Sequence, residues 1–299
     1  MARGRRADTI AGYAFIGPWL LGFLAFVIAP ILISLFLSFT RYDILSAPKW
    51  IGVANYVRLL TRDPKFWHSM GVTLLTVLVS VPLRLAFALV VAMLLNTRYR
   101  AVALYRALYY LPSLIGGSVA VAVMWRQLFG NEGAVNSLLA LAGLPSRISW
   151  LGDPGLAIWT IILLLVWQFG SSMLIFLAGL KNIPAAYYEA ATVDGARGMQ
   201  RFVRITIPLL SPVILFNLVM QTIGSFLVFT PSYIITQGGP LDSTLVYALY
   251  LYQRGFQYFQ MGVASAMAWI ILLVIAGSTA LIFRSSSAWV YYEAKGDGR

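Results

Sequence analysis

The stretch IAGYAFIGPWLLGFLAFVIAPILISLFLSFT, residues 10–40, decides the class of this fold. It runs for 31 residues without a formal charge, whereas the apolar region of a cleaved signal peptide has about 7–15 residues. A membrane-spanning helix needs about 20 apolar residues. We therefore predict that this stretch is a first membrane span, from about Tyr13 to Phe39, which is not cleaved.

The rest of the chain repeats this pattern. It is 60% hydrophobic and 11% charged, against about 25% charged residues in soluble domains. The second predicted span is interrupted by Arg84, and the third contains Gly116 and Gly117. We expect an all-α integral membrane protein with a single transmembrane domain over residues 1–299. Its six predicted spans are residues 13–39, 71–96, 107–129, 156–180, 205–230 and 260–283.

Basic side chains indicate the orientation in the membrane. The net charge is +12, and its short clusters between apolar runs favour lipid head groups and topology control over nucleic acid. With the N-terminus inside, inner segments hold thirteen of the 22 Lys and Arg residues and outer loops hold seven. We therefore predict that both chain ends are cytoplasmic. The first outer loop is an exception to the rule, with Arg41, Lys49, Arg58, Arg62 and Lys65.

The inner loop after the fourth span is long: KNIPAAYYEAATVDGARGMQRFVRITIPLLSP, residues 181–212. Pro184 suits the first turn of a helix, the alanines that follow are strong helix formers, and Gly195 suits the turn that ends it. One face of this helix carries Tyr187, Ala190, Ala191 and Asp194. From the residues alone, two interpretations stay open: a helix resting on the membrane, or a surface for a partner.

This loop resembles the EAA motif of ABC importer permeases. The pattern EAA-TVD-G-ARGMQRFVR-I-T-I-P starts at Glu189, and Ile207 takes the place of the usual leucine. Residues 39–60 (FTRYDILSAPKWIGVANYVRLL), 106–129 (RALYYLPSLIGGSVAVAVMWRQLF) and 236–244 (TQGGPLDST) are similar to sugar permeases of the maltose and glycerol-3-phosphate type. The resemblance implies the type I ABC importer permease fold.

It also implies a role and partners. The loop at 181–204 would be the cytoplasmic coupling helix of a sugar or polyol importer in a bacterial cytoplasmic membrane. Implied partners are two ABC ATPase subunits that bind ATP and Mg, a second permease of different sequence, and an extracytoplasmic solute-binding protein. The implied coupling residues are Glu189, Ala190, Ala191, Asp194, Gly195 and Pro208.

The chain has few of the residues that catalysis or metal binding would require. There are no cysteines and one histidine, His68, predicted in a loop beside Trp67, so no metal site is expected. None of the four lysines follows a glycine, which excludes an ordinary P-loop. We therefore expect a non-catalytic transport subunit that binds no cofactor. The alternatives are a secondary transporter or channel working alone and a membrane-embedded enzyme.

Polar residues within the fourth and fifth predicted spans are candidates for a substrate path. Asn217, Gln221 and Ser225 are spaced by four, Phe229 continues this stripe, and Gln168 lies at a similar depth. Trp125 is a further aromatic side chain that suits an apolar sugar face. Two interpretations stay open, a polyol path or hydrogen bonds that hold helices together. Arg84 is an intramembrane charge with no acidic residue in any span to pair with it. Three interpretations of it stay open: contact with water in a cavity, hydrogen bonds to helix carbonyls, or a position facing the partner subunit.

Overall fold

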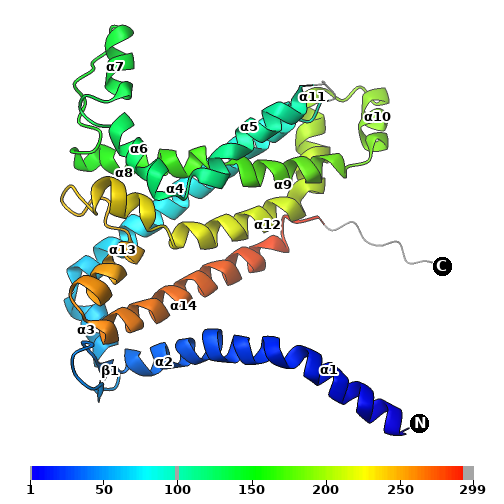
Figure 1. The fold of residues 1–299 in the computed structure, drawn as a ribbon. Helices are drawn as coiled ribbons and strands as arrows, with labels where there is room; N and C mark the ends of the chain where they lie inside the picture. The colour runs from blue at the N-terminus through cyan, green and yellow to red at the C-terminus, as the bar shows by residue number, and fades with distance from the viewer. Residues whose placement is uncertain (1, 98–100, 292–299) are drawn as a thin grey trace. The chain divides into compact units, whose positions relative to one another are not determined.

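The computed structural model describes residues 2–97 and 101–291, which fold mostly into helices (Figure 1). Contacts divide the chain into two compact units. The first unit comprises the chain up to Asp63 together with Leu251–Leu272, and the second comprises Pro64–Tyr250 together with the chain from Leu273 onward. This division by contacts does not test whether the chain acts as one transmembrane domain, so the single permease domain stays a prediction.

The first unit begins with a long apolar helix. Helix α1 (Ala2–Phe23) continues through a π-helical turn, η1 (Leu24–Ile28), into α2 (Ala29–Ser38). None of the most hydrophobic part of Gly12–Ser38 is buried within the structure. Its apolar side chains therefore require lipid or another chain as their surroundings.

The remaining elements of the first unit are two short strands, a short helix, a π-helical turn and the first part of α14. Strand β1 (Thr40–Arg41) pairs antiparallel with β2 (Lys49–Trp50), and they are followed by α3 (Ala54–Arg62), the π-turn η4 (Gln253–Gln257) and the first part of α14 (Met261–Ser286). The buried amide of Asn55 donates to the carbonyl oxygens of Ser38 (2.8 Å) and Thr40 (2.9 Å). A Cβ at Gly262 would lie 2.1 Å from the Thr40 carbonyl oxygen, so only glycine allows α14 to approach this strand.

The second unit is a bundle around α4. Its elements are α4 (Pro64–Leu94), α5 (Val102–Ile115), α6 (Val119–Leu128), α7 (Ala134–Leu141), α8 (Pro154–Trp167), α9 (Gly170–Lys181), α10 (Ala185–Val193), α11 (Gly198–Arg201), η2 (Phe202–Thr206), α12 (Ile207–Phe226) and η3 (Ser232–Thr236). Helix α13 (Tyr247–Tyr252) leads back to the first unit.

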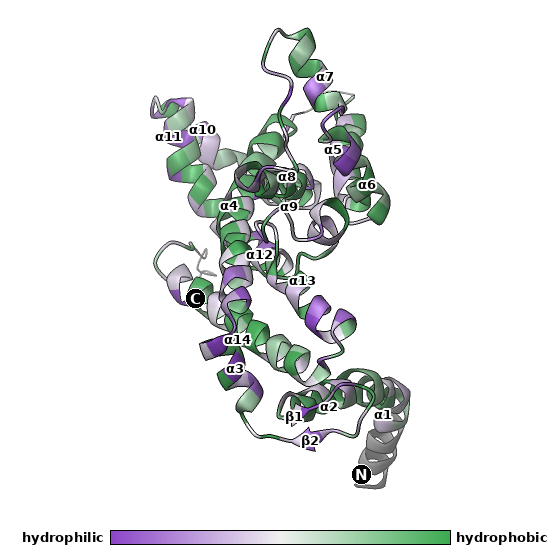
Figure 2. Ribbon diagram, turned by 90° about the vertical axis from the view of Figure 1, so that its left-hand side faces the viewer, coloured by the Kyte–Doolittle hydropathy of each residue, from purple (hydrophilic) through white to green (hydrophobic). Residues whose placement is uncertain are grey.

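Helix α4 contacts α8, α9 and α12, and α5 lies against α9. Ala88 and Ala92 of α4 are fully buried, because small side chains let neighbouring helices approach closely. Met173 and Phe176 of α9 and Leu210 of α12 fill the space between these helices. Figure 2 shows that α4 and α8 carry mainly hydrophobic residues. The helices that form this bundle are therefore the ones predicted to lie in the membrane.

Four described helices are long and apolar enough to cross a membrane: Gly12–Ser38, Pro64–Leu94, Gly198–Phe226 and Met261–Ser286. The third and fourth predicted spans are bent instead. Helices α5 and α6 meet at 100°, and α8 and α9 meet at 41°. The predicted number of six holds when each bent pair counts as one span.

Two local predictions were wrong. His68 lies in the first turns of α4 and not in a loop, because Pro64 opens the helix before the apolar run begins. Its Nε2 lies 2.9 Å from the carbonyl oxygen of Asp242. Phe229 does not continue the stripe of the fifth span, since α12 ends at Phe226. A new helical stretch begins at Thr230 and Pro231, a position near a helix start where proline is tolerated.

Candidate functional site

The loop between α9 and α12 forms a capped helix. Pro184 precedes α10, and Gly195 follows it with φ +74°. The N–H of Ala196 donates to the carbonyl of Ala191 (2.9 Å), and the N–H of Gly195 donates to that of Thr192 (3.1 Å). This is a Schellman motif, in which the left-handed residue is best filled by glycine. The predicted end of this helix at Asp194 and Gly195 is confirmed.

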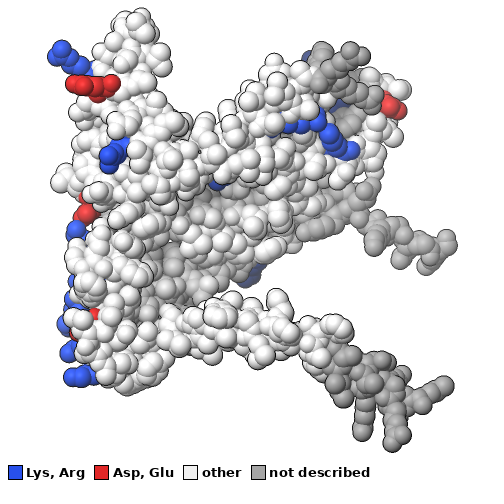
Figure 3. Space-filling model, in the orientation of Figure 1, with Lys and Arg blue, Asp and Glu red and all other residues white. Residues whose placement is uncertain are grey.

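This helix is exposed yet firmly attached. Neither α10 nor α11 has a buried residue, and Val193 is 89% exposed. The hydroxyls of Tyr188 and Thr206 lie 2.9 Å apart, and Arg201 Nη1 donates to Thr192 Oγ1 (3.0 Å). Figure 3 shows acidic atoms at the edge of the molecule where α10 lies. The loop thus presents an exposed helix with two acidic residues, Glu189 and Asp194, which is hydrogen-bonded to the segment leading into α12.

A cavity of about 240 Å³ lies where three interruptions of the helices meet. The first is the α5–α6 bend at Gly116 and Gly117, the second is the α8–α9 bend at Gln168, and the third is the segment after α12. Its lining residues are Arg84, Gly116, Gly117, Leu165, Gln168, Gly224, Ser225, Leu227, Val228, Phe229, Thr230 and Pro231. Irregular backbone at membrane depth is tolerated where it lines a cavity, and transporter sites are often built from such broken helices.

Gln168 links two of these interruptions. Its side-chain Nε2 donates to the Gly116 carbonyl (3.1 Å), and its own carbonyl accepts from Ser113 Oγ (2.9 Å) and from Arg84 Nη2. A Cβ at Gly116 would lie 2.3 Å from Gln168 Cγ, so this contact requires glycine. The bends are therefore positioned by one another and by α4, which carries Arg84.

The structure brings together only half of the predicted path residues. Gln168, Ser225 and Phe229 line the cavity. The other three, Asn217, Gln221 and Trp125, are absent from its lining.

These three take part in packing between and within helices. Trp125 Nε1 donates to the Thr160 carbonyl (3.0 Å) within a buried cluster. Gln221 Nε2 donates to Ser172 Oγ (2.9 Å) on α9. Asn217 is fully buried, and its amide donates to the Val213 carbonyl of its own helix (3.2 Å). The bonds of Trp125 and Gln221 each join two helices, as the helix-packing interpretation expects, whereas the bond of Asn217 stays within α12.

Sequence reasoning singled out Arg84 as an intramembrane charge without assigning it to the substrate path, and it did not include Gly116, Gly117 and Thr230 among the site residues. The adjacent glycines in an apolar run were the available signal, because glycine pairs interrupt membrane helices at binding sites. Thr230 carries no such signal, since it reaches the cavity only through the chain that follows α12.

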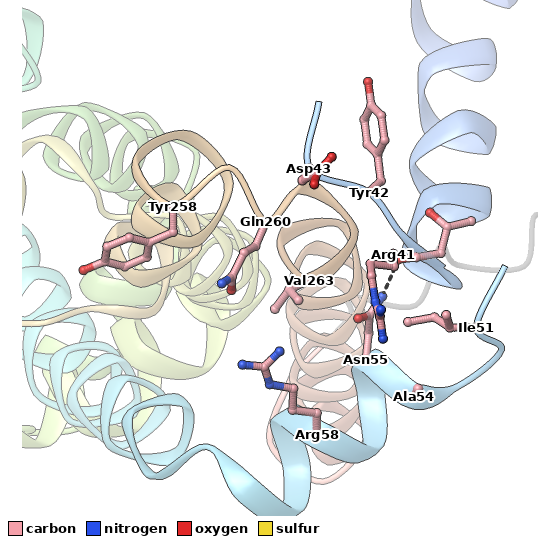
Figure 4. Close-up of a pocket in the computed structure, with 11 residues that line it drawn as sticks. Arg41, Tyr42, Asp43, Ile51, Ala54, Asn55, Arg58, Tyr258, Gln260 and Val263 are labelled. Atoms are coloured by element: carbon pink, nitrogen blue, oxygen red, sulfur yellow. Dashed lines mark hydrogen bonds between the residues drawn. The ribbon is translucent and has the colours of Figure 1, made fainter. Parts of the chain in front are cut away.

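A second hollow, of about 430 Å³, lies within the first unit between β1, α3 and the start of α14. Figure 4 shows the Arg58 guanidinium pointing into it below Val263. The polar amides around it are already bonded: Asn55 to main-chain carbonyls, and Gln260 Oε1 to Arg254 Nη1 (2.9 Å). Asp43 accepts from Ser46 Oγ (2.7 Å), which lowers the pKa of its carboxyl. None of the residues predicted for the substrate path lines this hollow, so the cavity at the helix breaks is the better candidate site.

A model of the family described as "Binding-protein-dependent transport system inner membrane component" matches residues 84–287. The chain belongs to this family. It is therefore a multi-pass inner-membrane permease subunit of an ABC importer and not an enzyme, as predicted. Among the described residues there is also no group of three His, Cys, Asp or Glu that would hold a metal ion.

Individual relatives cover almost the whole permease. The chain is 58% identical over 296 residues to "Probable ABC transporter permease protein YesP" of Bacillus subtilis, covering 98% of this chain and 96% of the relative. It is 36% identical to the lactose transport system permease protein LacF of Rhizobium radiobacter, covering 91% and 92%. The fold is similar to a chain in the crystal structure of a bacterial alginate ABC transporter in complex with alginate pentasaccharide-bound periplasmic protein, with a TM-score of 0.78, 24% identity and 96% coverage of both chains. This likeness confirms the predicted type I importer permease fold.

Proposed function

We propose that this permease carries a sugar or related polyol, delivered by an extracytoplasmic binding protein. The relative that transports lactose supports this substrate class. The observation that carries the proposal for mechanism is the capped, exposed helix α10, which is hydrogen-bonded to the segment leading into α12. Through it, closure of an ATPase would move the helices that line the cavity.

In this proposal α10 is the coupling helix. Glu189, Ala190, Ala191 and Asp194 face an ABC ATPase, and Gly195 maintains the turn beneath them. Pro208 lies at the start of α12, the helix that leads towards the cavity. Small alanine side chains let another surface come close, and exposed Val193 adds apolar area. Both features support docking into a protein cleft.

The test compares two glycines of the same loop. Gly195 has positive φ, whereas Gly198 does not, and an added Cβ meets no atom within 4 Å at either position. Alanine at a left-handed position costs about 1–2 kcal/mol. Gly195→Ala is therefore expected to lower ATPase co-purification and transport-coupled ATP hydrolysis, while Gly198→Ala retains both. A wild-type complex that retains no ATPase in lipid nanodiscs would refute the proposal.

The remaining assembly follows from the same proposal. Two ATPase subunits bind ATP and Mg, this chain holds no cofactor, and a second permease of different sequence completes the pathway. Both termini face the cytoplasm, which the thirteen basic residues of the inner segments support. Exposed apolar side chains of α1 and α2, such as Phe15 and Phe26, lie against lipid or the second permease.

The substrate path is proposed at the cavity. The amide of Gln168 and the hydroxyl of Ser225 suit sugar hydroxyls, and Phe229 suits an apolar sugar face. Phe229 stacks on Tyr233, with ring centroids 5.2 Å apart, which holds it in place. Phe229→Ala is expected to reduce sugar uptake at least tenfold in the reconstituted importer. Equal uptake by Phe229→Ala and wild type would exclude this cavity from the path.

A further inference from the structure

Arg84 is the charged side chain among the residues that line the cavity at the helix breaks. It lies within α4, where a positive charge at membrane depth is costly and usually marks a functional site. None of the described membrane-spanning segments contains an Asp or Glu. The charge of Arg84 therefore has no acidic counterpart within the described spans of this chain.

The hydrogen bond by which Arg84 holds the α8–α9 bend does not require a positive charge. Its described hydrogen bond, from Nη2, goes to the Gln168 carbonyl at the α8–α9 bend. That carbonyl already accepts from the neutral hydroxyl of Ser113 (2.9 Å). An uncharged polar side chain could donate a hydrogen bond to the second lone pair of the Gln168 carbonyl oxygen, without the free-energy cost of burying a charge.

The Arg84 guanidinium has more N–H donors than its described hydrogen bond uses. Its Nε is buried without a hydrogen-bond partner in the described structure, and the group carries five N–H donors in a planar fork that matches a carboxylate. Two helices, α6 and α9, begin at the bends beside it, and their N-terminal dipoles add positive potential. The cavity therefore combines a single positive charge with neighbours suited to sugar hydroxyls.

We propose that Arg84 binds the carboxylate of an acidic saccharide as it passes through the cavity. The proposal rests on the proposed function, because it assigns a substrate class to the same path. Neutral sugars use Gln168, Ser225 and Phe229 alone, whereas a uronic acid residue adds an ion pair with Arg84. The importer therefore favours uronate-containing oligosaccharides over neutral ones at this step.

The test measures binding rather than uptake, so that the specificity of the binding protein does not enter. The assembled importer in lipid nanodiscs, without binding protein and ATP, is equilibrated with a radiolabelled hexuronate trisaccharide. The matched probe is the same trisaccharide with each carboxylate reduced to a primary alcohol. A charge-assisted hydrogen bond is worth about tenfold or more in affinity. The wild-type importer is therefore expected to bind the acidic sugar at least about tenfold more tightly.

Three variants isolate the charge. Arg84→Gln is expected to abolish the preference and leave binding of the neutral sugar within about twofold, whereas Arg84→Lys retains part of it. Arg106→Gln is the matched control, because Arg106 Nη2 also donates to a helix-end carbonyl, that of Leu95 (2.8 Å), but is absent from the lining of the cavity. It is expected to keep the full preference. Monodisperse elution of each complex shows that it is folded.

The outcomes separate this inference from the proposed path. If wild type binds both sugars equally, or Arg84→Gln keeps the preference, the assignment of Arg84 is overturned. If the neutral sugar still binds and Phe229→Ala weakens it, the path stands without an acidic substrate. If neither sugar binds to wild type, both the path and the role of Arg84 are refuted.

Discussion

Gly170 offers the sharpest test of how the bundle is packed. It is buried at the start of α9, where this helix crosses α5. A Cβ here would lie 2.5 Å from the Tyr109 carbonyl oxygen, 2.7 Å from Tyr110 Cα and 2.9 Å from Ser113 Oγ. Two of these atoms belong to the main chain and cannot rotate away. Gly170→Ala therefore forces the two helices apart.

The expected cost follows from these contacts. Overpacking a close-packed site costs about 1–3 kcal/mol, which exceeds the roughly 0.5–1 kcal/mol that alanine gains over glycine in a helix. At about 2–4 °C per kcal/mol for a chain of comparable size, the midpoint of thermal unfolding should fall by several degrees. Unfolding of the purified chain in detergent, followed by tryptophan fluorescence, measures it.

Gly71 provides the control. It lies exposed in α4, and an added Cβ meets no atom within 4 Å. Gly71→Ala is therefore expected to keep or slightly raise the unfolding midpoint, opposite in sign to Gly170→Ala. An unchanged midpoint for Gly170→Ala would mean that α5 and α9 do not cross this closely.

Three further substitutions test other contacts. Asp63→Asn removes the negative charge from the ion pair with Arg254, whose side chains are 8% and 17% exposed. The free energy of unfolding should therefore fall by about 3–5 kcal/mol, which a denaturant titration would measure. Trp125→Phe removes the donor to the Thr160 carbonyl and should cost about 1–3 kcal/mol by the same titration while transport stays unchanged. Gln221→Leu should change stability by about 1 kcal/mol or less and leave the sugar uptake rate within about twofold.

Each of these has a contradicting result. An unaltered titration for Asp63→Asn would show that this ion pair does not form. A loss of transport in Trp125→Phe at normal expression, or a tenfold loss of uptake in Gln221→Leu, would return that residue to the substrate path.

Local features of this protein were predicted well. Two features depend only on residues close together in the chain. They are the long apolar run at residues 10–40, and the helix-forming alanines and the glycine around residues 185–195. The helix α10 and its end at Gly195 were therefore predicted from composition and from the left-handed turn that glycine permits. Helix ends were less accurate, as His68 and Phe229 show, because a proline acts several residues away from where the hydrophobic pattern changes.

The sequence by itself determined that this chain lies in a membrane, which of its segments are apolar enough to cross it, and that the loop at residues 181–212 carries an EAA-type helix. Only the tertiary structure decided which polar residues meet. Gln168, Ser225, Phe229 and Arg84 are far apart in the chain and gather because three helices are interrupted at neighbouring points. Helical spacing places residues on a face, but the bends at Gly116 and Gln168 turn those faces, and their angles depend on packing between helices.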